Sequence, residues 1–136
     1  MNKVLFWDFN GTLTKPTSLW SPTLLKTLNL YDNNTKVTLE DIRLHMKTGF
    51  TWHTPEKDYS NLVDDKWWEF MYKRFYEIYT ILGVNSEVAI KASKEVKNTI
   101  LDIDNYCIYE DTISTLEECV KLGYKNYLLS NNYPEL

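Results

Sequence analysis

The sequence predicts an α/β fold in which two parallel strands are separated by a long helical insertion. One apolar run, Lys3 to Trp7, stands near the start of the 136-residue chain, and another, Tyr124 to Leu129, stands near its end. The second run follows a helical pattern and Gly123, which is the order of elements in the second half of a βαβ unit. Between the two runs, apolar residues recur at steps of three and four, the spacing of helices.

The first strand is expected over residues 3–7, which are rich in β-forming residues and lack polar alternation. A continuous apolar run of this length indicates a strand buried on both faces. The Asn10-Gly11 pair that follows is also the strongest local signal for a hairpin, because both residues tolerate a positive φ. Residues 3–15 taken alone therefore leave a simple hairpin and a site loop equally open.

The insertion is expected to begin with two short helices. Ser21 is expected to cap the first of them, with Pro22 at the first helical position. Thr38 and Asp41 have the spacing of a capping box at the start of the second helix. Gly49 is expected to end that helix.

Two longer helices follow in the insertion. The segment 65–82 carries an apolar stripe at helical spacing, with Asp64-Asp65 as its expected cap and Gly83 after its end. The next helix is expected to begin near Ser86. Its apolar face is expected to continue as far as Ile103.

Polar residues end the second strand as they end the first. Asp111 or Thr112 is expected to cap a helix, and the strand after this helix ends in Ser130 and Asn131. Ligands of parallel sheets bind beyond the carboxyl ends of the strands. Asp8 and Ser130 are both expected at such ends, so they can meet despite their distance in the sequence.

The composition is that of a globular protein, with 43% hydrophobic and 25% charged residues. The net charge is −4 and the charges are interspersed, so we expect no nucleic-acid partner. The chain has no apolar run of about 18 residues, so we expect no membrane span. Because Asp8 and Gly11 come early in the chain, we also expect no secretory signal. Cys107 and Cys119 lack metal-ligand spacing and are interpreted as free thiols in a reducing cytoplasm, with a single disulfide as the alternative.

A family resemblance starts at Asp8. The stretch around it reads VLFWDFNGTL and resembles the first motif of the haloacid dehalogenase-like hydrolase superfamily, an apolar strand followed by Asp-x-Asp-Gly-Thr-Leu or a variant. The stretch that ends in Ser130 and two asparagines, GYKNYLLSNN, resembles the second motif of that family. The resemblance implies a Rossmann-like parallel core formed by residues 1–15 and 108–136. Residues 16–107 would be an inserted α-helical cap.

The resemblance also implies a magnesium-dependent phosphomonoester hydrolase that acts on a small phosphorylated substrate. Asp8 would be the nucleophile that forms an aspartyl-phosphate. It would also bind Mg²⁺, together with the backbone carbonyl of Asn10. The residues that would contact the phosphoryl group are Gly11, Thr12, Ser130 and Asn131.

Asn10 departs from the family pattern, which usually has an aspartate here that protonates the leaving group and then activates water. A carboxamide has hydrogen-bonding groups but no usable pKa near neutrality. Positioned acid–base groups raise reaction rates roughly 10²–10⁴-fold, so we expect the catalytic rate to be lower by a factor of this size. The loss of rate would be smallest for a substrate with a good leaving group, such as an acyl phosphate.

Two further motifs of the family, a lysine and a set of metal-binding acids, normally follow the serine motif. Neither is found between Ser130 and Leu136. Two strands with one covering helix would leave apolar faces and strand edges exposed. We therefore expect either a missing C-terminal half or a homo-oligomer that buries this surface.

Three functions stay open at this point. The first is the phosphatase described above. The second is a catalytically inactive, truncated relative that acts as an interaction module, which Asn10 and the absent lysine favour. The third is a metal-independent dehalogenase that forms an alkyl ester on Asp8.

Other polar residues are weaker candidates. His53 is expected to have a structural role or to be exposed. Arg43 and Lys47 lie one helical turn apart, which fits an anionic substrate and a solvated helix face equally.

Overall fold

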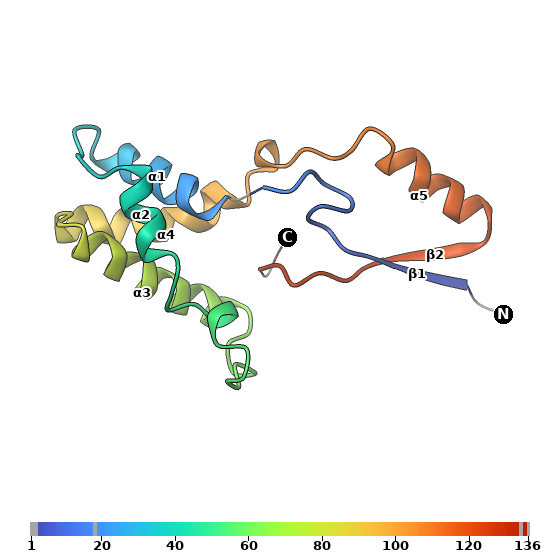
Figure 1. Ribbon diagram of the computed structural model, residues 1–136, viewed down its shortest axis with the longest axis horizontal. Helices are drawn as coiled ribbons and strands as arrows, with labels where there is room; N and C mark the ends of the chain where they lie inside the picture. Colours follow the sequence, from blue (N-terminus) through green and yellow to red (C-terminus); the bar gives the residue numbers. More distant parts are fainter. Residues whose placement is uncertain (1–2, 18, 134, 136) are drawn as a thin grey trace. The chain divides into compact units, whose positions relative to one another are not determined.

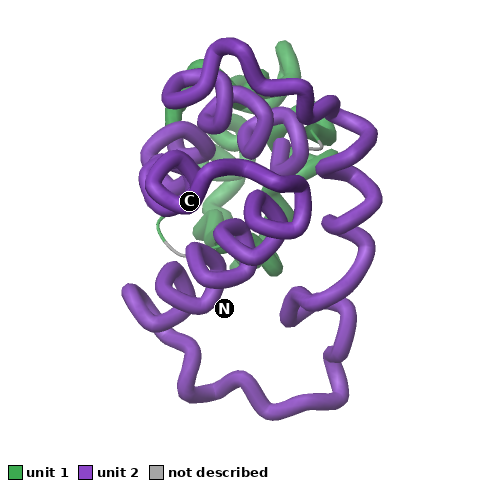
Figure 2. Tube along the Cα trace, turned by 90° about the vertical axis from the view of Figure 1, so that its left-hand side faces the viewer, with its two compact units in different colours: residues 1–17, 102–136 green, residues 18–101 purple. Residues whose placement is uncertain are grey.

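The computed structural model describes residues 3–17, 19–133 and 135. The chain divides into two compact units, one of residues 1–17 and 102–136 and the other of residues 18–101 (Figure 2). We call them the strand unit and the helical unit. The division falls a few residues from the expected insertion limits of 16 and 107.

The described part of the strand unit holds a parallel sheet of β1 (Lys3–Trp7) and β2 (Tyr124–Leu128) (Figure 1). The register runs from Lys3 opposite Tyr124 to Trp7 opposite Leu128. Helix α5 (Thr112–Lys121) leads into β2 and packs beside it. Helices and a parallel strand pair occur together in this chain, so the α/β class expected from the sequence is confirmed at that level.

Side-chain amides tie the elements of the strand unit together. Trp7 Nε1 donates a hydrogen bond to Asn126 Oδ1 at 3.0 Å, which links β1 to β2. Asn126 Nδ2 donates to the carbonyl of Leu116 at 3.1 Å, which links β2 to α5. The Leu129 amide donates to the Trp7 carbonyl at 2.8 Å, so the pairing continues one residue beyond β2. These bonds bring the segments after β1 and β2 to the same edge.

The strands are more exposed than the sequence indicated. The side chains of Val4 and Phe6 in β1 are 40% and 67% exposed, so the expectation that this strand is buried on both faces is wrong. Because β1 pairs with β2 alone and α5 packs beside β2, the described elements of this unit cannot cover both faces of the sheet. An apolar run thus identified a strand, but the covering layers that such a run implies are not among the described residues.

The helical unit is built around the packing of α1 and α3 on α4, with α2 against α1. Its elements are α1 (Trp20–Tyr31), α2 (Leu39–His45), the 3₁₀ turn η1 (Thr51–His53), α3 (Asp65–Ile81) and α4 (Ser86–Ile100). The stripes expected on the two long helices are confirmed, since Trp68, Phe75, Ala92 and Val96 are among the buried core residues. Packing of these stripes is what stabilises helices of this length.

The apolar face of α4 ends earlier than expected. The helix stops at Ile100, and Ile103 is 81% exposed in the 3₁₀ turn η2 (Ile103–Asn105). The cause is local, because the Asp102 side chain accepts a hydrogen bond from the Asp104 amide at 3.1 Å and starts a new turn. Ile103 therefore does not belong to the core of the helical unit.

The capping box at the start of α2 is confirmed. The Thr38 amide donates to Asp41 Oδ2 at 2.8 Å, and the Asp41 amide donates to Thr38 Oγ1 at 3.2 Å. The expected cap at Ser21 is wrong, because α1 begins at Trp20 and Ser21 is buried in its first turn. Asp64 stands at the N-cap position of α3, but its side chain makes no capping hydrogen bond.

Gly49 does not cap α2, which ends at His45. The carbonyl groups near this helix end are satisfied instead by Arg74, whose Nη2 donates to His45 O at 3.3 Å and to Thr48 O at 3.2 Å. Gly49 has φ +83°, and a Cβ there would lie 2.6 Å from Arg74 Nε. The glycine is therefore needed for the close approach of the arginine rather than for a helix cap.

Two wider expectations concern cysteine chemistry and membrane spans. Cys107 and Cys119 are free, as expected. Within residues 3–17, 19–133 and 135, no helix has both the length and the apolar character needed to cross a bilayer.

Candidate functional site

Asp8 and Ser130 meet at the carboxyl edge of the sheet. Asp8 directly follows β1, and Ser130 is two residues beyond the end of β2. The register that pairs Trp7 with Leu128 places both ends at the same level. Ser130 Oγ donates a hydrogen bond to Asp8 Oδ1 at 2.9 Å. A contact between residues 122 positions apart in sequence is thus produced by strand pairing.

The two oxygens of the Asp8 carboxylate have different surroundings. Oδ1 accepts hydrogen bonds from Ser130 Oγ and, at 2.8 Å, from the Phe9 amide. Oδ2 accepts none from the described residues. The carboxylate is therefore held by one oxygen, and the lone pairs of the other remain available to a ligand.

The loop after Asp8 is a tight turn rather than a hairpin. The Phe9 carbonyl accepts hydrogen bonds from the Leu13 and Thr14 amides, both at 3.0 Å. The Gly11 amide donates to the Thr14 carbonyl at 2.7 Å, and Gly11 has φ +83°. Because β1 pairs with β2 and not with the segment that follows it, the simple hairpin is wrong.

A cavity of about 430 Å³ opens beside the carboxylate. It is lined by Asp8, Asn10, Leu129, Ser130, Asn131 and Asn132. Four of the sequence-derived candidates therefore share one hollow, while Gly11 and Thr12 do not line it. Thr12 lies instead at a smaller cavity together with Trp7 and Leu13. Asn132 was not singled out from the sequence, although its place directly after Ser130-Asn131 was the available signal.

The groups around the cavity are oxygen donors of the kind that Mg²⁺ prefers. Asp8 supplies a carboxylate, and Asn10 supplies an amide and a backbone carbonyl. Within the described residues, no group of three or more His, Cys, Asp or Glu side chains is placed to hold a metal ion. Mg²⁺ is commonly bound through one or two carboxylates, substrate phosphate and water, so this donor set fits such an ion only jointly with an anionic ligand.

Aromatic residues cluster near this cavity without lining it. The rings of Phe9 and Tyr106 lie 5.7 Å apart, and the Tyr106 hydroxyl contacts the hydroxyl of Tyr133. Burial raises the pKa of Tyr106 to about 12, so this hydroxyl stays protonated near neutrality. Phe9 and Tyr133 also line a hollow of about 200 Å³ that shares Ser130 with the main cavity. Nothing in the local sequence pattern marked Tyr106.

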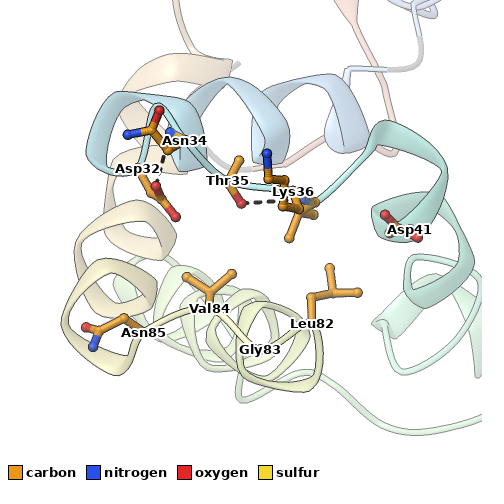
Figure 3. Close-up of a pocket in the computed structure, with 10 residues that line it drawn as sticks. Asp32, Asn34, Thr35, Lys36, Asp41, Leu82, Gly83, Val84 and Asn85 are labelled. Carbon is orange, nitrogen blue, oxygen red and sulfur yellow. Dashed lines mark hydrogen bonds between the residues drawn. The ribbon is translucent and has the colours of Figure 1, made fainter.

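The helical unit has a cavity of its own, of about 520 Å³, between the loop after α1 and the loop after α3 (Figure 3). Two of its polar side chains already form hydrogen bonds within the loop after α1. Asp32 Oδ1 accepts from the Asn34 amide at 3.2 Å, and Thr35 Oγ1 accepts from the Val37 amide at 3.3 Å. Apolar side chains from the facing loop, including Leu82 and Val84, complete the lining. The arrangement gathers no nucleophile next to a base.

Two of the weaker candidates, His53 and Arg43, have partners within the helical unit. His53 Nδ1 accepts from the Phe50 amide at 3.3 Å, as expected for a structural histidine. Arg43 pairs with Glu40 at 3.7 Å on the exposed face of α2. These contacts do not place His53 or Arg43 next to a nucleophile or a metal-binding group.

Comparison with known proteins adds no assignment, because no family model matches the chain and no curated protein matches it significantly.

Proposed function

We propose that the protein is a magnesium-dependent phosphomonoester hydrolase that acts through an aspartyl-phosphate on Asp8. The observation that carries this proposal is the 2.9 Å hydrogen bond from Ser130 Oγ to Asp8 Oδ1 at the edge of a parallel sheet. Sites of α/β proteins lie at this edge. A carboxylate with a hydroxyl donor beside it matches the needs of phosphoryl transfer, a nucleophile and a hydrogen bond to the transferring group.

The chain's own residues supply most of the first step. Asp8 Oδ2, which accepts no hydrogen bond from the described residues, attacks phosphorus, and the bond from phosphorus to the ester oxygen breaks. The Ser130 hydroxyl then donates to a phosphoryl oxygen instead of Asp8 Oδ1. The asparagine amides at the cavity stabilise the charge on the same group. Water later attacks phosphorus, and the bond from phosphorus to Asp8 Oδ2 breaks. Both protons of the water leave with the phosphate, which restores the free carboxylate.

Magnesium would be held by the Asp8 carboxylate and the Asn10 backbone carbonyl. When bound, it neutralises phosphate charge. The side chain of Asn10 cannot protonate the leaving oxygen, because an amide has no usable pKa near neutrality. The proposed substrate is therefore a small phosphorylated molecule whose leaving group departs with little proton transfer.

The finer architecture belongs to the same proposal. The strand unit would be part of a Rossmann-like core, and the helical unit would be a cap inserted between β1 and α5. The order of elements and the parallel pairing of β1 with β2 support this interpretation. The two free cysteines are compatible with a reducing cytoplasm.

Binding of phosphoryl mimics tests the proposal without requiring turnover. Fluoroberyllate or fluoroaluminate should bind only in the presence of Mg²⁺, and Asp8→Ala should abolish binding. Asp111→Ala is a matched control, because Asp111 is an exposed acid of the same unit whose side chain makes no capping hydrogen bond. Titration calorimetry or fluorine NMR measures the affinity. Equal binding by wild type and Asp8→Ala would show that the site is assigned wrongly.

A second candidate function is an interaction module without catalysis. The exposed side chains of Phe6 and Tyr127 favour it, because these two rings lie opposite each other on the sheet, 5.8 Å apart, and such an apolar surface suits a protein partner. The two functions differ in a simple assay. Turnover of a general phosphate ester above the level of Asp8→Ala excludes a purely structural role.

A further inference from the structure

Asn10 is the one asparagine in the sequence that is followed by glycine. Asparagine is chemically labile, because the backbone nitrogen of the next residue can attack its side-chain carbonyl carbon. Glycine at that next position removes the side chain that would hinder the attack. The Asn10-Gly11 pair therefore has the highest intrinsic reactivity among the asparagines of this chain.

The structure leaves this pair accessible. Asn10 and Gly11 are both exposed, and a Cβ placed on Gly11 would meet no atom within 4 Å. The Asn10 side chain lines the open cavity beside Asp8 rather than a packed interior. Water and hydroxide can therefore reach the reacting atoms.

A neighbouring hydroxyl is placed to assist the reaction. Thr14 Oγ1 lies 3.4 Å from Asn10 Oδ1, and Thr14 is 1% exposed. The same hydroxyl lies 3.2 Å from the Phe9 carbonyl, so its single proton serves one acceptor at a time. As the Asn10 carbonyl oxygen gains negative charge during the attack, it becomes the stronger acceptor, and a fixed donor stabilises it.

One hydrogen bond opposes the reaction. The Gly11 amide donates to the Thr14 carbonyl at 2.7 Å, and this bond must open before the nitrogen can attack. The reaction should therefore be slower than in an unstructured peptide with the same residues. The bond lies in an exposed loop, where local opening costs little.

We propose that Asn10 is a self-modification site, at which intramolecular deamidation turns an amide into a second carboxylate beside Asp8. Gly11 N loses its proton to hydroxide and bonds to Asn10 Cγ, and the bond from Cγ to the amide nitrogen breaks to release ammonia. Water then opens the resulting five-membered imide. Opening at Cγ yields an ordinary aspartate, and opening at the main-chain carbonyl yields the isomer whose backbone runs through Cβ. The balance is one water consumed and one ammonia released.

The consequence for the site rests on the proposed function. An aspartate at position 10 supplies the proton donor and base that the amide lacks, and positioned acid–base groups are worth roughly 10²–10⁴-fold. It also adds a carboxylate to the oxygen donors of the cavity. The newly made chain would thus have little hydrolase activity, and the activity would rise as Asn10 is converted to aspartate.

A time course of the purified chain at mildly alkaline pH tests the proposal. Peptide mass spectrometry should find conversion at Asn10, with the mass change of NH₂ replaced by OH, before conversion at any other asparagine. Asn85 is the internal control, because it precedes Ser86 and its Oδ1 already accepts from the Glu87 amide at 2.9 Å. Fragmentation that distinguishes the two isomers gives the fraction of ordinary aspartate. Thr14→Val should slow the conversion.

Turnover of a phosphate ester with Mg²⁺ is followed in parallel. Aged protein should gain activity in proportion to its ordinary aspartate, fresh Asn10→Asp should begin at the gained level, and Asn10→Gln should gain none. If Asn10 persists while Asn85 converts, the modification site is overturned, whatever the activity of Asn10→Asp. If Asn10 converts first but neither aged protein nor Asn10→Asp turns over substrate, the modification stands and the proposed hydrolase is overturned.

Discussion

The helical unit and the strand unit differ in how far their apolar side chains are buried. Every large hydrophobic side chain that is fully buried within the described residues belongs to the helical unit, Phe75 and Tyr79 among them. In the described strand unit, the buried residues are Thr14 and Thr112, while Phe6 and Leu129 are largely exposed. The residues of the proposed chemistry therefore lie on the unit that has no closed apolar core.

The difference follows from geometry. Amphipathic helices that pack on one another enclose a core from segments close in sequence, whereas a pair of strands needs further strands or helices to enclose one. What holds the strand unit together is polar, including the bonds of Asn126 to Trp7 and to Leu116. The apolar core and the residues of the proposed chemistry therefore lie in different parts of the chain, and each can be altered separately.

The strongest test separates the two units. Residues 18–101 produced alone should fold and melt cooperatively, because their core is internal to that segment. Residues 1–17 joined to 102–136 by a short flexible linker should show no cooperative melt, because they lack a buried apolar core. Circular dichroism and amide hydrogen exchange measure both. An unfolded helical segment, or a cooperatively folded strand segment, would contradict the comparison.

A matched pair of phenylalanines gives the next largest effect. Phe75→Ala removes a fully buried ring that contacts Trp20 and Phe50, so it should cost ~3–5 kcal/mol in the free energy of unfolding of the helical unit. Phe6→Ala removes a ring that is 67% exposed and contacts Tyr127, and should cost less than about 1 kcal/mol. Hydrogen exchange should report each loss in its own unit, since one global melting curve would mix the two. Equal losses of stability in the two variants would contradict the difference in burial between the two units.

A buried hydroxyl gives a smaller effect. Tyr79 donates to the Leu24 carbonyl at 2.7 Å and lies 2.9 Å from Thr27 Oγ1. Tyr79→Phe should destabilise the helical unit by about 1 kcal/mol, the usual net value of one hydrogen bond. The loss stays small because Thr27 Oγ1 can still donate to the Leu24 carbonyl, at 3.1 Å. Tyr76→Phe is the control, because the Tyr76 hydroxyl lies 3.2 Å from Ser86 Oγ in a solvent-exposed setting, and its loss should shift the denaturant midpoint less than Tyr79→Phe.

The smallest effect depends on pH. Hydrogen bonds from the Thr38 side chain and then from its backbone amide lower the pKa of Asp41. Because the folded pKa lies below the unfolded one, the stabilisation is present above the ordinary carboxyl pKa and is lost as the pH falls through the folded value. Asp41→Asn should therefore flatten the acid side of the stability curve of the helical unit. A curve that keeps the wild-type slope in this variant would exclude the capping box as its source.

The sequence predicted the elements better than their surroundings. Apolar stripes located α3 and α4 closely, and an uninterrupted apolar run located β1, because periodicity depends on the segment itself. Burial depends on what packs against a segment, and this information is not local. For this reason, the predicted burial of β1 was wrong and Ile103 was assigned to a core it does not join.

The candidate site shows the same limit. Asp8 and Ser130 were selected by residue type and by their places after two strands, and strand pairing brings them together. The capping box at Thr38 was predicted from its local pattern, whereas the capping bonds expected at Ser21 and Asp64 do not form. At the end of α2, a distant residue decides the outcome. Arg74 satisfies the end of α2 from another helix, and no pattern near Gly49 could reveal it. The same holds for Tyr106, which contacts Phe9 and Tyr133 only in the folded chain.

The pairing of Trp7 with Leu128 has a consequence for how such a chain can vary in length. Loss or gain of one residue within β2 would move Ser130 by ~3.3 Å and turn its side chain to the other face of the sheet, away from Asp8. Extra residues in the loop 54–64 of the helical unit would leave that pairing unchanged. Related chains should therefore differ in length in the loops between helices, while the short segments before Asp8 and Ser130 admit substitutions but no insertions or deletions.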